Sequence, residues 1–340
     1  MLKNRINIEG KKFMLNGREI WMNGANTPWQ HWDDFGKKFD YDFWDTHYKM
    51  LHDAGVNSSR VWITCSGDVG VDIDENGFVK GATQQHWEDL DGLFQAAQKN
   101  GIYIMATLMS FDHFKEENKN HLCWRAMVQN DEAMDSYIEN YLIPLCQKFG
   151  HYNAFWSIDL CNEPDWVYEN EEAGKLDWKH LCRFFAKAAA AIHTNSDILV
   201  TIGYAIVKYN SEKYFGDLGS DAYLQSCYAH EKAYVDFYST HYYEWMAPDY
   251  GIPFDKSPED FGIETDKPVV LGEFPALGLI GDQANSQPMD TTACYMGCFE
   301  NGWQGIFPWT SNGIDRCGNM EQMEPALKAV YAAAKDMLQI

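Results

Sequence analysis

The chain has 340 residues, of which 46% are apolar, so it can bury a substantial core and is neither a disordered nor a fibrous protein. Its 27 basic and 50 acidic residues give a net charge of −23, and such a surface repels nucleic-acid backbones and anionic lipid headgroups. We therefore expect neither a nucleic acid nor a membrane as partner. The composition does not predict an oligomeric state.

The sequence also bears on the compartment. No apolar run approaches the roughly 18 residues of a membrane span, and the opening segment MLKNRINIEGKKF lacks the apolar core of a secretory signal. The nine cysteines are dispersed without a CxxC pair, which favours free thiols in a reducing compartment and no metal site. We expect a cytoplasmic protein as the sequence stands, or a secreted one if a leader has been removed.

Apolar or β-branched runs alternate along the chain with segments of 3.6-residue periodicity. The runs predict eight strands, at Glu19–Asn26, Ser58–Thr64, Ile102–Leu108, Phe155–Leu160, Ile198–Gly203, Asp236–His241, Pro268–Gly272 and Gly305–Trp309. The periodic segments predict helices at Phe43–Ala54, His86–Asn100, Asp131–Phe149, Trp178–Thr194, Asp221–Ala229, Ser257–Gly262, Thr291–Asn301 and Glu324–Leu338. This order predicts a single (β/α)8 TIM barrel domain over residues 1–340.

The first residues predict a small addition to the barrel. Arg5–Ile8 and Phe13–Leu15 flank the turn Glu9–Lys12, which contains a glycine, and together they indicate a short β-hairpin. We expect residues 1–18 to cap the floor of the barrel, a structural role.

Two predicted strands end in a glutamate. Glu163 follows the fourth strand in the segment Asn162-Glu163-Pro164, and Glu273 follows the seventh in Leu271-Gly272-Glu273. The carboxyl ends of barrel strands converge around one mouth, where the active sites of such barrels lie. A carboxylate rarely ends an apolar strand without a partner, so this pair predicts a catalytic site.

Two carboxyl groups facing each other across a barrel mouth can hydrolyse a glycosidic bond. A gap of about 5 Å suits direct attack on the sugar and retention of configuration, whereas about 6.5–9.5 Å admits a water molecule and gives inversion. The aromatic content of 15% agrees with sugar binding, because sugar rings stack on flat apolar side chains. The sequence does not determine the distance between the two carboxyl groups.

The motif Asn162-Glu163-Pro164, together with Glu273, resembles the retaining (β/α)8 glycosidases of clan A, and especially glycoside hydrolase family 5. The resemblance implies that Glu163 is the acid/base and Glu273 the nucleophile. It also implies that Arg60 holds the nucleophile ionised and that Asn162 hydrogen-bonds the 2-hydroxyl of the sugar. Neither a metal nor an organic cofactor is expected for this two-carboxylate mechanism.

The same resemblance implies further substrate-binding residues. His241 and Tyr243 match a His-x-Tyr pair on the sixth strand, and Trp309 matches a tryptophan beneath the sugar at the cleavage point. His113 is the candidate for a histidine after the third strand, and Trp166 is the candidate for stacking on the leaving-side sugar. Several other residues are possible sugar contacts for which we favour packing: Trp29, Trp32, Asp112, Glu244, Trp245 and Trp303.

The roles of the two glutamates predict opposite pKa shifts. Arg60 beside Glu273 should depress the pKa of that carboxyl, whereas a dry site and a negative neighbour should raise the pKa of Glu163. Taken singly, Arg60, His241, Tyr243 and Trp309 are each more typical of ion pairing or core packing. Their order along the chain favours catalysis.

The substrate is less sharply indicated than the chemistry. The segment Leu15–Glu19 leading into Met22–Asn26 resembles the opening of β-mannanases, which favours β-1,4-linked mannan or manno-oligosaccharides. An endo-β-1,4-glucanase or another β-glucan hydrolase is the alternative within the family. A barrel that binds carbohydrate without hydrolysing it is the alternative from another class, disfavoured because both glutamates are present.

Overall fold

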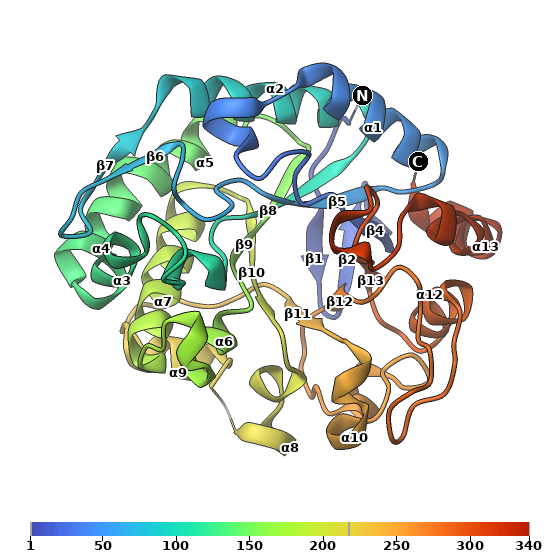
Figure 1. Cartoon of the computed structure of the whole chain (residues 1–340). Helices are drawn as coiled ribbons and strands as arrows, with labels where there is room; N and C mark the ends of the chain where they lie inside the picture. The colour runs from blue at the N-terminus through green and yellow to red at the C-terminus, as the bar shows by residue number, and fades with distance from the viewer. Residues whose placement is uncertain (1, 217, 340) are drawn as a thin grey trace.

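The computed structural model describes residues 2–216 and 218–339. Parallel strands form a closed barrel at its centre, with helices around the outside (Figure 1). In ring order the strands are β4 (Met22–Asn26), β5 (Ser58–Trp62), β8 (Tyr103–Thr107), β9 (Phe155–Asn162), β10 (Leu199–Tyr204), β11 (Tyr238–His241), β12 (Val269–Glu273) and β13 (Gly305–Ile306). The predicted (β/α)8 TIM barrel is confirmed.

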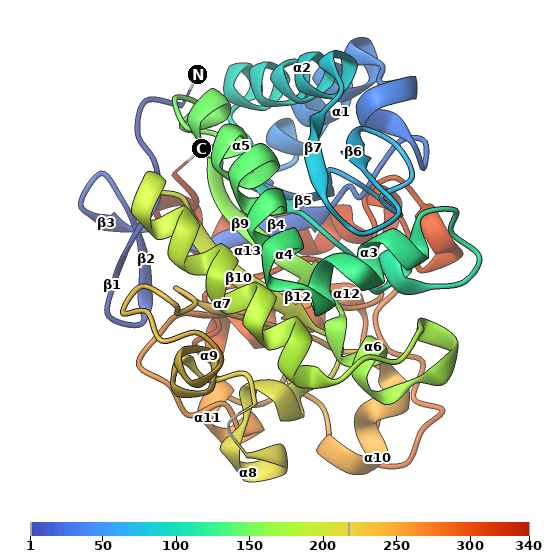
Figure 2. The ribbon, with the colours of Figure 1, turned by 90° about the vertical axis from the view of Figure 1, so that its left-hand side faces the viewer.

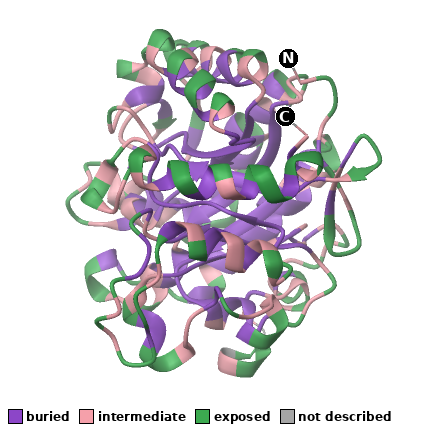
Figure 3. Ribbon diagram, turned by 90° about the vertical axis from the view of Figure 1, so that its right-hand side faces the viewer, coloured by how far each residue is buried: buried purple, intermediate pink, exposed green. Residues whose placement is uncertain are grey.

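The barrel strands are buried between the barrel interior and the helices, and β8, β9 and β12 accordingly consist largely of apolar and β-branched residues. Figure 3 shows the buried residues concentrated in this centre and the exposed ones on the outer helix faces. β13 is the exception in length. It ends at Ile306, although the chain runs on beside the end of β12 as far as Trp309.

Capping residues determine where the longer helices begin. Thr83 accepts a hydrogen bond from the backbone N–H of His86 at the start of α2, and Asp177 accepts one from Lys179 at the start of α7. The helices are α1 (Tyr41–Asp53), α2 (Gln84–Asn100), α3 (His121–Gln129), α4 (Asp131–Tyr137), α5 (Ile143–Phe149), α6 (Pro164–Glu169), α7 (Trp178–Asn195), α8 (Glu212–Phe215), α9 (Asp221–Cys227), α10 (Ala247–Tyr250), α11 (Pro258–Phe261), α12 (Thr291–Glu300) and α13 (Met320–Leu338).

Several regions depart from the predicted elements, among them the unpredicted helices α3, α6, α8 and α10. The helix expected over residues 131–149 is divided into α4 and α5 by a π-helical turn at Ile138–Leu142. An unpredicted hairpin of β6 (Val71–Ile73) and β7 (Val79–Ala82) packs against that turn, since Asn140 donates to the carbonyl of Val79. In the described ranges no helix is both long enough and apolar enough to cross a membrane.

The N-terminal hairpin is present, with β1 (Asn7–Glu9), β2 (Lys12–Leu15) and β3 (Arg18–Glu19) forming an antiparallel sheet. Its buried side chains Ile6, Phe13 and Leu15 belong to one apolar cluster with residues of the barrel strands, among them Met22 and Trp156. Figure 2 shows this sheet at one end of the barrel and α6 and α10 toward the other. The hairpin therefore closes the barrel end opposite to the site described next.

Candidate active site

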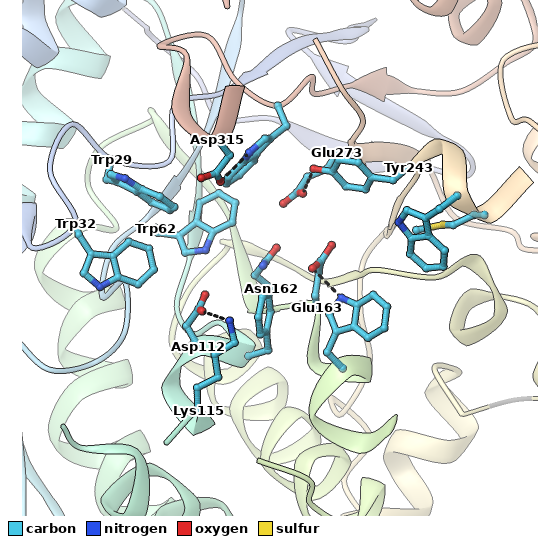
Figure 4. Close-up of a pocket in the computed structure, with 15 residues that line it drawn as sticks. Trp29, Trp32, Trp62, Asp112, Lys115, Asn162, Glu163, Tyr243, Glu273 and Asp315 are labelled. Carbon is cyan, nitrogen blue, oxygen red and sulfur yellow. Dashed lines mark hydrogen bonds and ion pairs between the residues drawn. The ribbon is translucent and has the colours of Figure 1, made fainter. Parts of the chain in front are cut away.

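A cleft of about 620 Å³ opens at the carboxyl ends of the barrel strands. Both glutamates singled out in the sequence face into it (Figure 4). Its lining combines aromatic rings with a few polar groups, as expected for a sugar-binding site: Trp29, Trp32, Trp62, Phe111, Asp112, Lys115, Asn162, Glu163, Trp166, Tyr243, Trp245, Met246, Glu273, Trp309 and Asp315.

The backbone at Glu163 turns sharply from β9 into α6. Glu163 adopts the left-handed conformation, with φ 51° and ψ 49°, which is uncommon and strained for a residue other than glycine. Its N–H donates to the carbonyl of Gly203, and the buried carboxylate of Asp165 accepts from the N–H groups of Ala205 and Ile206. These bonds fix the end of β9 to β10 and hold Glu163 over the mouth.

Glu273 ends β12 and is held at both carboxylate oxygens. Arg60 Nη1 donates to Oε1 over 2.6 Å, and the Tyr243 hydroxyl donates to Oε2 over 2.9 Å. The carboxylate is 5% exposed and the guanidinium is fully buried. This geometry leaves Glu273 little freedom to rotate, as attack on a single carbon atom requires.

His241 lies between the two glutamates. Its Nδ1 atom is 2.9 Å from Oε1 of Glu163 and 3.5 Å from Oε2 of Glu273. One oxygen of each carboxyl group and this nitrogen all lie within 4.8 Å of one another. Burial lowers the pKa of His241 to about 4, so the imidazole is neutral near pH 7. These three side chains offer metal-ligand atoms, but the same atoms are arranged for proton transfer and nucleophilic attack.

Arg60 organises the floor of the site. Besides Glu273, it donates to Asp159 from Nε and Nη2, and to the side-chain carbonyl of Asn162 from Nη2 over 2.8 Å. Burial acts to lower the pKa of Arg60, but the charges of Asp159 and Glu273 raise it above its ordinary value. Gly203 makes room for this network, since a Cβ atom there would lie 2.8 Å from Arg60 Nη2.

The pKa shifts agree with only one of the two sequence predictions. Burial raises the pKa of Glu163 to about 7, against opposing contributions from Arg60 and from the indole N–H of Trp166. Burial also raises the pKa of Glu273, although His241 and Arg60 both oppose the rise. The expected depression of the Glu273 pKa is therefore wrong, because desolvation of this carboxyl outweighs the nearby positive charge.

Most of the sequence-predicted residues gather around the glutamates. Asn162 turns its carbonyl to Arg60, which leaves its N–H donors for a ligand. Trp166 donates its indole N–H to Glu163 Oε2 over 3.0 Å. The backbone of Trp309 is hydrogen-bonded beside the end of β12, and its indole N–H lies 3.3 Å from Asp315.

Of the sequence-predicted site residues, His113 is the one that neither lines the cleft nor hydrogen-bonds a glutamate. It is fully buried, with Nδ1 accepting from the N–H of Ser110 and Nε2 lying 3.1 Å from the hydroxyl of Thr64. Its ring packs edge-on against Trp124. His113 supports the loop after β8, and its neighbours Asp112 and Lys115 face the cleft instead.

Sequence reasoning missed several residues of the site. Asp159 lies on β9, whose other residues are mostly apolar, and its carboxylate is the second anion paired with Arg60. Trp62 lies on the same face of β5 as Arg60, two residues along, and its ring is 4.2 Å from the guanidinium carbon. Trp29 and Trp32, for which packing was favoured, line the cleft, whereas Trp303 is fully buried in the core.

Comparisons with known proteins find similarity to β-1,4-mannanases in both sequence and structure. No protein-family model matches the chain. A mannan endo-1,4-β-mannosidase of Mytilus edulis is 25% identical over 338 residues, which cover 91% of this chain and 89% of that protein. One of Cryptopygus antarcticus is 21% identical over 345 residues, covering 92% and 86%. Among solved structures, a β-1,4-mannanase of Aplysia kurodai matches with a TM-score of 0.83 and 26% identity, covering 96% of each chain.

The resemblance to mannanase-type enzymes of glycoside hydrolase family 5 is thereby confirmed in sequence and in fold. It extends over nearly the whole chain, and with it over both strand ends that carry the glutamates.

Proposed function

We propose that this protein is a retaining glycoside hydrolase that cleaves β-1,4-linked mannan internally, with residues 1–340 acting as a single catalytic domain. The observation that carries the proposal is the placement of Glu163 and Glu273, whose nearest carboxylate oxygens lie within 4.8 Å of each other. That separation is well below the roughly 6.5–9.5 Å of inverting enzymes and close to the roughly 5–5.5 Å of retaining ones, so it supports retention. The names of the relatives support mannan as the substrate.

In the first step, Glu273 attacks the anomeric carbon while Glu163 protonates the departing glycosidic oxygen. The bond between that carbon and oxygen breaks, and an ester between Glu273 and the sugar forms. A pKa of about 7 leaves Glu163 about half protonated at neutral pH and almost fully protonated in acidic solution, so the acid form that this role requires is available. The hydroxyl of Tyr243 and the guanidinium of Arg60 hold the carboxylate of Glu273 in position for the attack.

In the second step, Glu163 has lost its proton and acts as the base. It takes a proton from a water molecule, the water oxygen attacks the anomeric carbon, and Glu273 departs as a carboxylate. Each step inverts the anomeric centre, so the product retains the β configuration. The contact between Glu163 and neutral His241 steadies the carboxyl group in both protonation states.

Different residues of the cleft contact the two parts of the substrate on either side of the cleaved bond. Trp309, beside the end of β12, supports the sugar that is attacked, and Asn162 donates to its 2-hydroxyl. Trp166 lies next to the acid/base, and its ring is 5.7 Å from that of Trp245. These two rings form a platform for the leaving part of the chain, because sugars stack on exposed aromatic faces.

The product profile on two polymers tests the proposal. We expect a solution of galactomannan, a soluble β-1,4-mannan, to lose viscosity well before many reducing ends appear, which indicates internal cleavage, and carboxymethyl-cellulose to stay intact. Proton NMR should show the β anomer as the first product. Faster cleavage of carboxymethyl-cellulose would establish the glucanase alternative. Binding of mannan without any hydrolysis would establish the non-hydrolytic barrel.

A further inference from the structure

The cleft contains an ion pair that the proposed mechanism does not use. The ammonium of Lys115 lies 2.9 Å from Oδ1 of Asp112, on the loop that follows β8. The two side chains are 28% and 20% exposed, and both line the cleft. Such a partly exposed pair adds little to stability, so its place in the cleft calls for another explanation.

Hydrogen bonds from neighbouring residues hold Asp112 in place. The hydroxyl of Ser110 donates to Oδ2 of Asp112, and the side-chain amide of Asn118 donates to its backbone carbonyl. Buried His113 holds the backbone of Ser110 from below. Side chains whose positions are already fixed bind a ligand with less loss of conformational entropy, as in a preorganised binding site.

The ammonium has donors to spare for a ligand. Among the described residues, Asp112 is its only hydrogen-bond partner, which leaves two of its three N–H groups. The same nitrogen lies 4.3 Å from the ring centroid of Phe111, another residue of the cleft lining. A cation held in this way donates strong hydrogen bonds to sugar hydroxyls, since bonds from a charged donor exceed those between neutral groups.

The position of Asp112 and Lys115 relative to the glutamates determines which sugar of the substrate they can contact. Figure 4 shows Asp112 and Lys115 on the same side of the glutamates as Trp29, Trp32 and Trp62, with Tyr243 on the other side. The rings of Trp62 and Trp309 lie 5.0 Å apart, so the tryptophans continue outward from the sugar that is attacked. The leaving part of the chain is expected toward Trp166 and Trp245.

We propose that Lys115, positioned by Asp112, hydrogen-bonds the second sugar on the donor side and makes hydrolysis depend on the length of that part of the chain. The inference rests on the proposed function and adds a specificity-determining contact to it. Trp29 and Trp32 form the opposite wall of this subsite, so the second sugar has an apolar wall on one side and a charged donor on the other.

Dinitrophenyl β-mannoside and dinitrophenyl β-mannobioside test the proposal, because they share a leaving group and differ only by the second donor-side sugar. We expect the bioside to have a much higher kcat/KM in the parent enzyme. Lys115→Met should reduce that advantage about tenfold or more and leave the monosaccharide substrate within about twofold. Lys99→Met is the matched control, because Lys99 forms a similar ion pair with Asp45, at 2.7 Å, between the outer helices α1 and α2.

The outcomes separate the inference from the function on which it rests. A parent enzyme inactive on both substrates and on mannan would overturn the proposed function itself. An active parent enzyme whose bioside advantage survives in Lys115→Met would overturn only the inference. An equal loss on both substrates would also overturn it, since Lys115 would then act on the glutamates or the fold. The thermal unfolding midpoint of Lys115→Met should equal that of the parent enzyme. A selective loss of activity on the bioside is then a local effect and not a loss of folded protein.

Discussion

Trp166 donates its indole N–H to Oε2 of Glu163 over 3.0 Å, so the residue that borders the leaving side of the cleft also sets the proton affinity of the acid/base. A hydrogen bond to a carboxylate stabilises the charged form and lowers the pKa of the group. This bond opposes the effect of burial, which raises the pKa of Glu163 to about 7. Sugar contact and proton transfer are thereby coupled at one side chain.

We predict that kcat/KM falls as the pH rises through about 7, because Glu163 must hold its proton to assist the leaving group. Trp166→Phe removes the N–H donor and should move this alkaline limb to higher pH. The measurement is the pH dependence of kcat/KM on a manno-oligosaccharide. A limb that stays in place or moves to lower pH in Trp166→Phe would contradict the assignment of Glu163 as the group that titrates.

We predict that Glu163→Ala affects substrates according to their leaving groups. A dinitrophenolate leaves without a proton, so dinitrophenyl β-mannobioside should still form the ester at Glu273 rapidly, whereas mannan cleavage should fall about 10²–10⁴-fold. Added azide should speed release of the sugar from that ester and give a β-mannobiosyl azide. The assay compares initial rates on both substrates, and equal losses would mean that Glu163 is not the acid/base.

Removal of the nucleophile should have a different signature. Glu273→Ala should abolish turnover of both natural and activated substrates, because the ester cannot form. Azide, if it enters the space left by the carboxylate, should attack the face of the sugar opposite to the leaving group and give an α-mannosyl azide. Product anomers are assigned by NMR. A β-azide from this variant would show that another group acts as the nucleophile.

Gly203 offers a test of the support beneath the glutamates. A Cβ atom at this position would lie 2.8 Å from Arg60 Nη2 and 3.0 Å from both Asp159 Oδ2 and His241 Nε2. Gly203→Ala should therefore destabilise the fold by about 1–3 kcal/mol in denaturant unfolding and lower kcat by displacing the Arg60 network. Unchanged unfolding and unchanged kcat would show that the network accommodates the added methyl group despite its close packing.

The barrel and its two glutamates were predictable because they depend on local patterns. Buried strands require apolar runs, and the chain order of those runs is enough to place Glu163 and Glu273 on strands whose ends meet. Asp159 escaped prediction because it points into the barrel from a strand that also carries apolar residues. Only the closed ring brings Asp159 to Arg60, 99 positions earlier in the chain.

His113 and Lys115 illustrate the same limit at the scale of one loop. Both follow the third barrel strand, and sequence spacing alone does not say which side chain faces the cleft. The short 3₁₀ turn at Phe111–Phe114 buries His113 against Trp124, while Lys115, just beyond it, lines the cleft. The direction of the Glu273 pKa shift also depends on the depth of burial in three dimensions, which the sequence does not supply.

The central claim is that Glu273 forms a covalent bond to the sugar while Glu163 serves as acid and base. A 2-deoxy-2-fluoro-β-mannobiosyl fluoride tests it most directly, because it supplies both donor-side sugars and the fluorine at carbon 2 of the attacked sugar slows release of the ester so that it accumulates. We predict that intact-protein mass spectrometry shows one added fluorinated mannobiosyl group and that peptide mapping places it on Glu273. A sugar on any other residue, or an active enzyme that never acquires one, would contradict the mechanism.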